Sequence, residues 1–258
     1  MGFDLASKSV FVTGASSGIG EACAEAFAAQ GCRMLLAARR VERLDAVAER
    51  LRTDHGVEVH VGALDVRDRC AVNGWVEELP AEWASIDVLV NNAGLARGLA
   101  TVYDGDPQDW EEMIDTNVKG LLWVTRAVLR GMVARGSGHV INIGSIAGHE
   151  TYPGGNVYCA SKHAVTAIGR SLNIDVLGTG VRVSSVDPGL VETEFSVVRF
   201  HGDKRRADSV YQGLEPLTGA DVADAVIFCA TRPPHANVRE MILMPSAQAA
   251  SVHLHREA

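Results

Sequence analysis

The chain has 258 residues, which is enough for one large α/β domain or two small ones. Acidic residues outnumber basic ones by 32 to 24, so the formal net charge is −8, whereas a general nucleic-acid-binding protein usually has a basic excess. No apolar stretch approaches the roughly 20 residues that cross a bilayer, and no basic cluster suggests a membrane-surface protein. The composition therefore argues against nucleic-acid and membrane partners.

The amino terminus shows no basic segment followed by an apolar one, so no signal peptide is expected. The five cysteines are widely spread, and no pair has the spacing of a metal site or a redox motif. His253 and His255 form an H-x-H pair near the carboxyl terminus, but two ligands do not make a metal site. We therefore expect a cytoplasmic protein with reduced thiols and no metal.

Short apolar runs typical of buried strands alternate along the chain with amphipathic stretches typical of helices. The expected strands are residues 9–12, 34–37, 58–64, 87–91, 140–143, 181–186 and 241–244. The expected helices are residues 19–30, 41–52, 107–134, 158–177 and 221–231. This alternation predicts an α/β protein with a single-domain Rossmann fold over residues 1–258, in which helices cover both faces of a doubly wound, seven-stranded parallel sheet. Residues 193–219 fit no regular element and are expected to form a substrate-binding lid or loop.

A glycine-rich loop, residues 13–20, joins the first expected strand to the first expected helix. Its G-x-x-x-G-x-G spacing permits a tight turn and brings the backbone close to a pyrophosphate, while the helix amino terminus supplies free N–H groups. The strand–loop–helix context favours a dinucleotide site, although a glycine-rich turn without a ligand is the alternative. The loop residues expected to contact the cofactor are Gly14, Ser16, Ser17, Gly18, Ile19 and Gly20.

The end of the second strand carries Ala38-Arg39-Arg40, where a site for the non-phosphorylated cofactor would place an acidic residue. Two guanidinium groups suit bidentate contact with a 2′-phosphate, which a carboxylate would repel. Arg39 and Arg40 therefore predict NADP(H) rather than NAD(H). The alternative is a solvated arginine pair on the following helix.

Tyr158 and Lys162 stand at positions i and i+4 of an expected helix, on one face and a turn apart. A neighbouring ammonium lowers the pKa of a phenol, so Tyr158 could exchange a proton with an alcohol or carbonyl near neutral pH. Ser145 follows the fifth strand, at the sheet edge where open α/β proteins bind ligands, and its hydroxyl can orient a substrate oxygen. Each residue also has an ordinary explanation, as packed aromatic, solvated lysine or helix cap, and it is their combination with the glycine loop that favours catalysis.

Several motifs of this sequence occur in the same order and with the same spacing in one known protein family. They are the glycine loop, Leu64-Asp65-Val66, Asn91-Asn92-Ala93-Gly94, Asn117, Ser145, Tyr158-x-x-x-Lys162 and Pro188-Gly189. With these motifs the sequence resembles the short-chain dehydrogenase/reductase family over essentially its whole length. Several independent motifs in the right order make this resemblance very specific.

The resemblance implies a role for each matching residue. Tyr158 would be the general acid/base, Lys162 would lower its pKa and bind the nicotinamide ribose, and Ser145 would hold the substrate oxygen. Asn117 would hold the water through which a proton relay reaches Lys162. The other implied cofactor contacts are Asp65 and Val66 beside the adenine, Asn91, Ala93 and Gly94 along the cleft, and Pro188, Gly189, Val191 and Thr193 near the nicotinamide.

The second half of the chain resembles a narrower group, the NADP-dependent 3-hydroxy acid dehydrogenases, which include serine and allo-threonine dehydrogenases and malonic semialdehyde reductases. The matching segments are residues 154–158, 188–196, 198–200, 202–203, 210–211, 216–217, 234–235 and 244–245. This resemblance implies oxidation of the 3-hydroxyl of a short hydroxy acid, or reduction of the matching semialdehyde. His149-Glu150-Thr151 stands where substrate walls are expected and is not part of the group's pattern.

A small hydroxy acid carries a carboxylate, which a site normally meets with Arg, Lys or backbone N–H groups. Arg199, in the expected lid beside Phe195 and Phe200, is our first candidate for this contact. The alternative is a solvated arginine at the rim, because loops lie mostly on the surface.

The sequence thus predicts an NADP(H)-dependent alcohol dehydrogenase or carbonyl reductase with a small-molecule substrate. The rivals are a reductase of a larger ketone or of a 3-oxoacyl thioester, and a non-catalytic NADPH-binding sensor. The acidic balance counts against a carrier-protein thioester, and the intact set of catalytic residues counts against a sensor. The family resemblance also implies a homotetramer in which the helices around residues 106–134 and 158–177 pack between subunits.

Overall fold

The structure, a computed structural model, describes residues 4–257. Seven parallel strands form one sheet in the order β3-β2-β1-β4-β5-β6-β7. The strands are β1 (Ser9–Thr13), β2 (Arg33–Ala38), β3 (Val59–Ala63), β4 (Val88–Asn91), β5 (Gly138–Ile143), β6 (Val181–Pro188) and β7 (Glu240–Leu243). The expected doubly wound Rossmann fold is confirmed.

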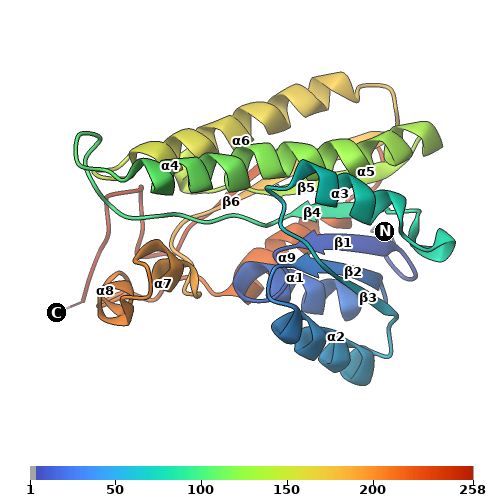
Figure 1. Cartoon of the computed structure of the whole chain (residues 1–258), viewed down its shortest axis with the longest axis horizontal. Coiled ribbons are helices and arrows are strands. Elements are labelled where there is room, and N and C mark those ends of the chain that lie inside the picture. The colour runs from blue at the N-terminus through green and yellow to red at the C-terminus, as the bar shows by residue number, and fades with distance from the viewer. Residues whose placement is uncertain (1–3, 258) are drawn as a thin grey trace.

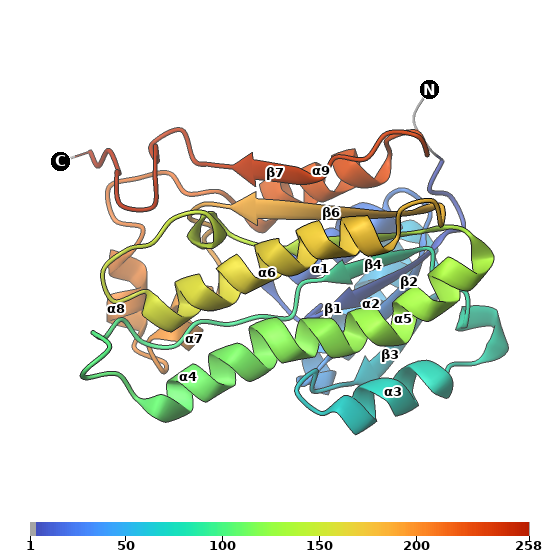
Figure 2. The ribbon, with the colours of Figure 1, turned by 90° about the horizontal axis from the view of Figure 1, so that it is seen from above.

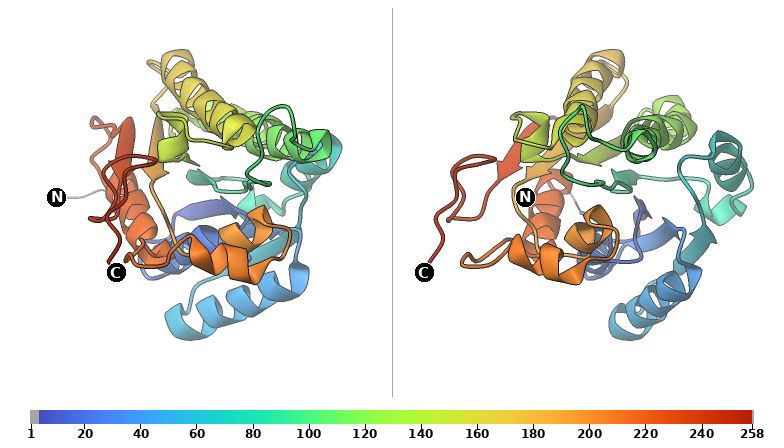
Figure 3. Two further views of the ribbon diagram at one scale, coloured as in Figure 1. Left: turned by 90° about the vertical axis from the view of Figure 1, so that its left-hand side faces the viewer. Right: turned by 60° about the vertical axis from the view of Figure 1, so that its left-hand side comes forward.

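Helices cover both faces of the sheet (Figures 1, 2 and 3). On one face lie α1 (Gly18–Ala28), α2 (Val41–His55) and α9 (Gly219–Ala230). On the other lie α3 (Arg69–Glu77), α4 (Pro107–Ile114), α5 (Leu121–Arg135) and α6 (Asn156–Asp175). Shorter elements are the single turns η1 (Ala81–Trp83), η2 (Asp115–Gly120) and η3 (Ile146–Gly148), and the helices α7 (Phe195–Arg199) and α8 (Lys204–Ser209).

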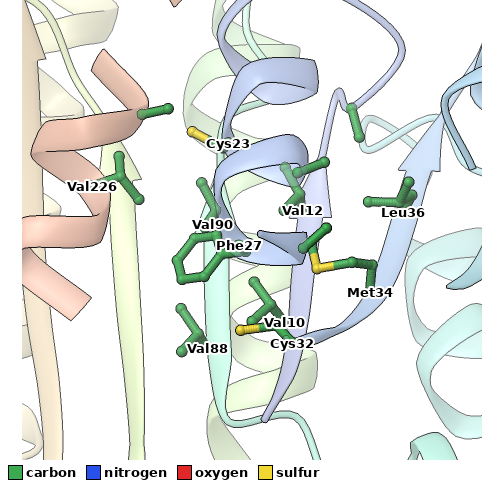
Figure 4. Packing of buried hydrophobic residues seen from close by; sticks show 14 of the residues in the cluster. Val10, Val12, Cys23, Phe27, Cys32, Met34, Leu36, Val88, Val90 and Val226 are labelled. Atoms are coloured by element: carbon green, nitrogen blue, oxygen red, sulfur yellow. The ribbon is translucent and has the colours of Figure 1, made fainter. Parts of the chain in front are cut away.

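The central strands β1 and β2 are almost entirely apolar because both of their faces are buried. Val10 and Val12 of β1 pack toward α1 and its Phe27, as Figure 4 shows. Phe11, between them, points to the opposite face, where its ring stacks on Trp75 with centroids 4.6 Å apart. The strands β1, β2, β4, β5 and β6 therefore contribute to two hydrophobic cores, one on each face of the sheet.

The chain reverses its direction of winding between β1 and β4, which are neighbours in the sheet although β2 and β3 separate them in sequence. At such a switch point the loops after the two strands turn to opposite faces, which leaves a crevice at the carboxyl ends of the strands. The glycine loop follows β1, and Asn92 and Ala93 follow β4, so the fold brings these segments together at this edge.

Three expectations for the secondary structure were wrong in detail. The long helix expected over residues 107–134 is interrupted by η2, a π-helical turn, and such turns are often found at functional sites. Helix α3 has no counterpart among the expected elements; it is short, and Val72 is its only buried residue. Residues 193–219 are not irregular throughout, since they contain α7 and α8, which are too short to show helical periodicity.

Candidate active site

A cleft of about 790 Å³ runs along the carboxyl ends of the strands. One end is bounded by the glycine loop and by Arg39 and Arg40, and the other by Tyr158 and α7. The expected dinucleotide site and the expected catalytic residues therefore share a single cavity.

The glycine loop approaches β4 so closely that side chains would not fit. A Cβ on Gly14, whose φ is +67°, would lie 2.9 Å from Asn92 Nδ2 and 3.0 Å from Ala93 Cα. A Cβ on Gly20 would lie 2.3 Å from Asn92 Nδ2 and 2.4 Å from the Gly14 carbonyl oxygen. Ser17 stands at the amino terminus of α1, and its side chain does not cap the helix N–H groups. The loop therefore forms a backbone cradle at a helix amino terminus, as a pyrophosphate requires.

Arg40 lies beside this cradle and donates from Nη2 to Ser17 Oγ at 2.6 Å. Its Nη1 contacts Glu194 Oε2 at 2.7 Å, and Arg43 Nη1 reaches the other oxygen of Glu194 at 2.6 Å. Arg39 lies 3.9 Å from Glu112 and is half exposed. Both residues of the predicted pair line the cleft next to the glycine loop, so the residues present fit a dinucleotide that carries a 2′-phosphate.

Most other expected cofactor contacts also line this cleft. They are Gly14, Ser16, Ser17, Gly18, Ile19, Asp65, Val66, Ala93, Gly94, Pro188, Gly189, Val191 and Thr193. Gly20 lies behind the loop against Asn92 rather than on the cleft wall.

The expectation that Asn91 lines the cleft was wrong. Its side chain is buried and donates to Thr125 Oγ1 at 2.8 Å and to Asn142 Oδ1 at 3.0 Å. Side chains alternate between the faces of a strand, and this alternation sends Asn91 toward α5. Asn92, the next residue, reaches Thr13 and Gly14 of the glycine loop and lines the cleft.

Asn117 lies on the π-helical turn η2 and is almost fully buried. Its Oδ1 accepts from the Leu95 N–H at 2.8 Å, and its Nδ2 donates to the Leu95 carbonyl and to Ser161 Oγ at 2.8 and 3.0 Å. A Cβ placed on Gly94 would lie 3.2 Å from Asn117 Oδ1 and 3.8 Å from Lys162 Nζ. Asn117 therefore approaches Lys162 from behind the cleft wall.

Ser145, Tyr158 and Lys162 meet on the cleft wall, each with less than a tenth of its surface exposed. Ser145 follows β5 and caps η3, because its Oγ accepts from the Ala147 N–H at 3.1 Å. Tyr158 and Lys162 stand one turn apart on α6, and Lys162 Nζ donates to the Ile143 carbonyl at 2.8 Å. The structure thus brings together the residues that the sequence indicated for proton transfer.

The expected lowering of the Tyr158 pKa by Lys162 is not found. Burial raises the pKa of Tyr158, while the Arg199 charge and a hydrogen bond with Ser145 act in the opposite direction. Burial also lowers the pKa of Lys162 to about 8, against the opposing charge of Asp187. The expectation placed the cation on the same helix, whereas the cation that acts on the phenol is Arg199, from α7.

Arg199 is enclosed by aromatic rings at the substrate end of the cleft. Its guanidinium carbon lies 4.9 Å from the ring centroid of Tyr158, 5.1 Å from that of Phe195 and 5.7 Å from that of Tyr152. Arg199 Nη2 donates to Tyr152 Oη at 2.7 Å, whereas its buried Nε has no hydrogen-bond partner. A buried donor without a partner is costly, so this corner of the cleft suits an anionic group.

Sequence reasoning missed two parts of the substrate end. Tyr152 and Pro153 line the cleft, whereas His149, Glu150 and Thr151 do not, so the wall lies a few residues after the segment in which it was expected. Four residues near the carboxyl terminus also line the cleft: Gln248, Ser251, Val252 and Leu254. Gln248 Oε1 accepts from the Leu190 N–H at 2.8 Å, and no local pattern in the sequence indicates that contact.

Across residues 4–257, no three His, Cys, Asp or Glu side chains are grouped as they would be around a metal ion. None of the helices in that part of the chain combines the length and apolar character needed to cross a membrane.

Comparison with known proteins gives the cleft a family context. The family model for short chain dehydrogenases matches residues 8–203. NADP-dependent 3-hydroxy acid dehydrogenase YdfG of Escherichia coli is 47% identical over 250 residues, which are 96% of this chain and 99% of that protein. Sulfoacetaldehyde reductase 2 of Chromohalobacter salexigens is 46% identical over 241 residues, covering 93% and 95%.

A solved structure of the closed form of serine dehydrogenase complexed with NADP+ superposes with a TM-score of 0.90 at 46% identity, covering 96% of this chain and all of that one. The family model spans most of the chain, and these relatives match it almost from end to end with well over 30% identity. The protein is therefore a member of the short-chain dehydrogenase family.

Proposed function

We propose that this protein is an NADP(H)-dependent oxidoreductase that exchanges a hydride with the 3-hydroxyl carbon of a small hydroxy acid, or with the carbonyl carbon of the matching semialdehyde. The observation that carries the proposal is the arrangement of one cleft. An arginine pair stands at its cofactor end, and a buried tyrosine faces an arginine at its substrate end. The relatives named above, a 3-hydroxy acid dehydrogenase and a serine dehydrogenase, support this reading.

NADP(H), when bound, supplies the carbon that accepts or donates the hydride. The glycine loop would hold the pyrophosphate, and Arg39 and Arg40 the 2′-phosphate. The other contacts would come from Asp65 and Val66 beside the adenine and from Ala93, Gly94, Pro188, Gly189, Val191 and Thr193 along the cleft.

Tyr158 would exchange the proton of the substrate hydroxyl, and Ser145, which shares the cleft wall with it, would orient the same oxygen. Asn117 would hold a water, and the proton would pass onward between that water and Lys162. Because burial raises the pKa of the phenol, the charge of Arg199 is part of what makes the phenolate accessible. In the oxidative direction the substrate proton moves to the Tyr158 phenolate as the hydride leaves carbon.

Arg199 would bind the carboxylate of the substrate. Its unpartnered Nε and its position over the Tyr158 ring place a fixed positive charge beside the reacting oxygen. A sulfonate has a similar charge and similar acceptor oxygens, which agrees with the sulfoacetaldehyde reductase among the relatives. A 3-oxoacyl thioester or a larger neutral ketone would leave this partly buried cation unused, so we rank those substrates second.

The test offers a panel of substrates to the purified protein and monitors turnover through the absorbance of the reduced nicotinamide. L-Serine, D-serine, L-allo-threonine, 3-hydroxypropionate and 3-hydroxyisobutyrate are offered with NADP+, and malonic semialdehyde and sulfoacetaldehyde with NADPH. We expect turnover of at least one acid and much weaker turnover of its methyl ester. Faster turnover of the ester, or of neutral ketones only, would contradict the assignment. NADPH binding without any turnover would instead favour the sensor.

We also propose a homotetramer in which α5 and α6 meet their counterparts. Large apolar side chains stand exposed at the carboxyl end of α6. Ile174, in its last turn, is 75% exposed, and Leu177, just after the helix, is 84% exposed. Exposed apolar side chains that lie close together, rather than scattered singly, are typical of an association surface. If the wild type sediments as a monomer and Ile174→Glu changes nothing, the tetramer is contradicted.

All five cysteines are free thiols, which agrees with a cytoplasmic location.

A further inference from the structure

A fully buried carboxylate lies directly behind the site and takes no part in the proposed chemistry. Asp187, in β6, has no exposed surface. Its Oδ1 accepts from Ser185 Oγ at 2.5 Å, and its Oδ2 is 2.7 Å from His149 Nε2. A buried carboxylate without donors would be strongly destabilising, so Ser185 and His149 are what allow Asp187 to remain there.

The carboxylate packs on the backbone that presents the reactive groups. A Cβ built on Gly144 would lie 1.8 Å from Asp187 Oδ1, so only glycine leaves room for the carboxylate. The residue before Gly144 is Ile143, whose carbonyl accepts from Lys162 Nζ, and the residue after it is Ser145. Asp187 therefore touches the one residue that joins the Lys162 acceptor to the Ser145 hydroxyl.

His149 fixes the other end of the same turn. Ser145 begins the turn η3 through its Oγ, and His149 ends it, with its N–H bonded to the Ile146 carbonyl. Because the imidazole is joined to Asp187, one side chain of β6 contacts both Gly144, which precedes Ser145, and His149, which ends η3. This accounts for His149, which stands out in the sequence although it does not line the cleft.

We propose that Asp187, held by His149 and Ser185, is a positioning group for Ser145 and Lys162. It would fix the turn that aims the Ser145 hydroxyl, and it would place a negative charge near the buried ammonium. The inference rests on the proposed roles of Ser145 and Lys162.

The negative charge of Asp187 acts on the pKa of Lys162 in a definite direction. Burial lowers the pKa of Lys162 to about 8, and Asp187 opposes that shift. The other charged groups around the pair are Arg170, which interacts with Asp187, and Glu150 and Glu240, which interact with His149. Removal of the Asp187 charge therefore favours the neutral amine, and Lys162 loses its proton at a lower pH.

The first experiment measures Lys162 directly and needs no substrate. The chain has four lysines, so ¹³Cε chemical shifts followed against pH resolve the buried one, and a Lys162→Arg spectrum assigns it. In Asp187→Asn, whose side chain has nearly the same shape, we expect the Lys162 midpoint to fall by roughly one pH unit. An unchanged midpoint would overturn the electrostatic part of the proposal, even if no substrate has been found.

The second experiment measures turnover with whichever substrate the wild type accepts. We expect Asp187→Asn to move the alkaline limb of kcat to lower pH with little change in KM for NADP+. His149→Ala should lower kcat several-fold, and His149→Gln, which keeps a donor, should recover most of it. Wild-type kcat in His149→Ala would overturn the positioning role.

A matched control is available at the opposite end of the same strands. His139, near the start of β5, is also buried and hydrogen-bonds Ser184 Oγ at 2.8 Å. It lies at the end of β5 that is remote from Ser145. His139→Gln should leave both the Lys162 midpoint and the pH profile of kcat unchanged. NADPH binding, measured by fluorescence, shows for every variant whether the fold is intact. If His139→Gln changed the Lys162 midpoint and the kcat profile as much as Asp187→Asn does, the effect would be general destabilisation and the proposal would fail.

Discussion

The end of the cleft beside β1 is formed mostly by backbone, whereas the end beside α7 is formed by side chains. At the first end, Gly14 and Gly20 approach Asn92 so closely that a Cβ has no room. At the second, Arg199 contacts the rings of Tyr152, Tyr158 and Phe195, which come from three separate segments. The glycine loop of the first end depends on the absence of side chains, whereas the second end depends on their identity.

This difference separates a cofactor end shaped by the backbone from a substrate end shaped by side chains. A backbone cradle binds groups that every dinucleotide shares, so few changes are compatible with its purpose. A side-chain pocket can be altered one residue at a time without disturbing the cofactor end. Substitutions at the two ends should therefore fail in different ways, and four of them test that contrast.

The largest effect is expected where the two ends meet. Tyr158→Phe removes the proton-exchanging hydroxyl and should lower kcat by about 10³-fold. The dissociation constant of NADPH, measured by fluorescence titration, should stay nearly unchanged because the ring remains. Activity within a factor of ten of the wild type would refute the role of Tyr158.

Gly20→Ala should damage the cofactor end through backbone contacts. The added Cβ would meet the Gly14 carbonyl at 2.4 Å, and overpacking of this kind typically costs about 1–3 kcal/mol. We expect weaker NADPH binding and a lower midpoint in urea unfolding. Gly74→Ala on α3 is the control, because its nearest neighbour, Glu78 Oε1, is 4.0 Å from the added atom. Equal behaviour of the two variants would argue against a tight cradle.

Arg199→Met should damage only the substrate end. Loss of a charge-assisted contact with a carboxylate should raise KM for the hydroxy acid by about 10- to 100-fold. It should also lower kcat at neutral pH, because the charge of Arg199 holds down the pKa of Tyr158. NADPH affinity should change far less, and a neutral alcohol should lose only the part of the turnover that depends on the pKa of Tyr158. An unchanged KM for hydroxy acids would remove Arg199 from the substrate site.

Arg40→Ala should have the smallest effect, because the guanidinium is partly exposed and its contacts are screened by water. We expect NADPH to bind about tenfold more weakly, as for the loss of one charge-assisted hydrogen bond, while NADH affinity is retained. Arg43→Ala is the matched control, since Arg43 shares Glu194 with Arg40 but does not line the main cleft. Tighter binding of NADH than NADPH by the wild type would contradict the assignment of the arginine pair.

Local chemistry accounts for what the sequence predicted well. Strands buried on both faces appear as apolar runs, and the glycine loop shows its geometry in its composition. Tyr158 and Lys162 are brought together by helical spacing alone, and Ser145 by its position at the end of a strand. The fold, the family, the cofactor and most of the site residues follow from such short-range patterns.

The tertiary structure decided what depends on contacts between distant segments. Asn91 and Asn92 are equivalent in sequence, and only the alternation of β4 sends one toward Thr125 and the other toward the cleft. No local sequence pattern distinguishes the π-helical turn that carries Asn117 from a continuous α-helix.

The substrate end shows the same limit most clearly. The cation that acts on Tyr158 is Arg199, from another segment, and His149 is joined to Asp187 across the sheet edge. Periodicity reports which face of an element is buried, but it does not report which distant side chain lies opposite. The sequence by itself therefore determined the scaffold and the cofactor cradle, and packing alone decided which charges surround the reacting oxygen.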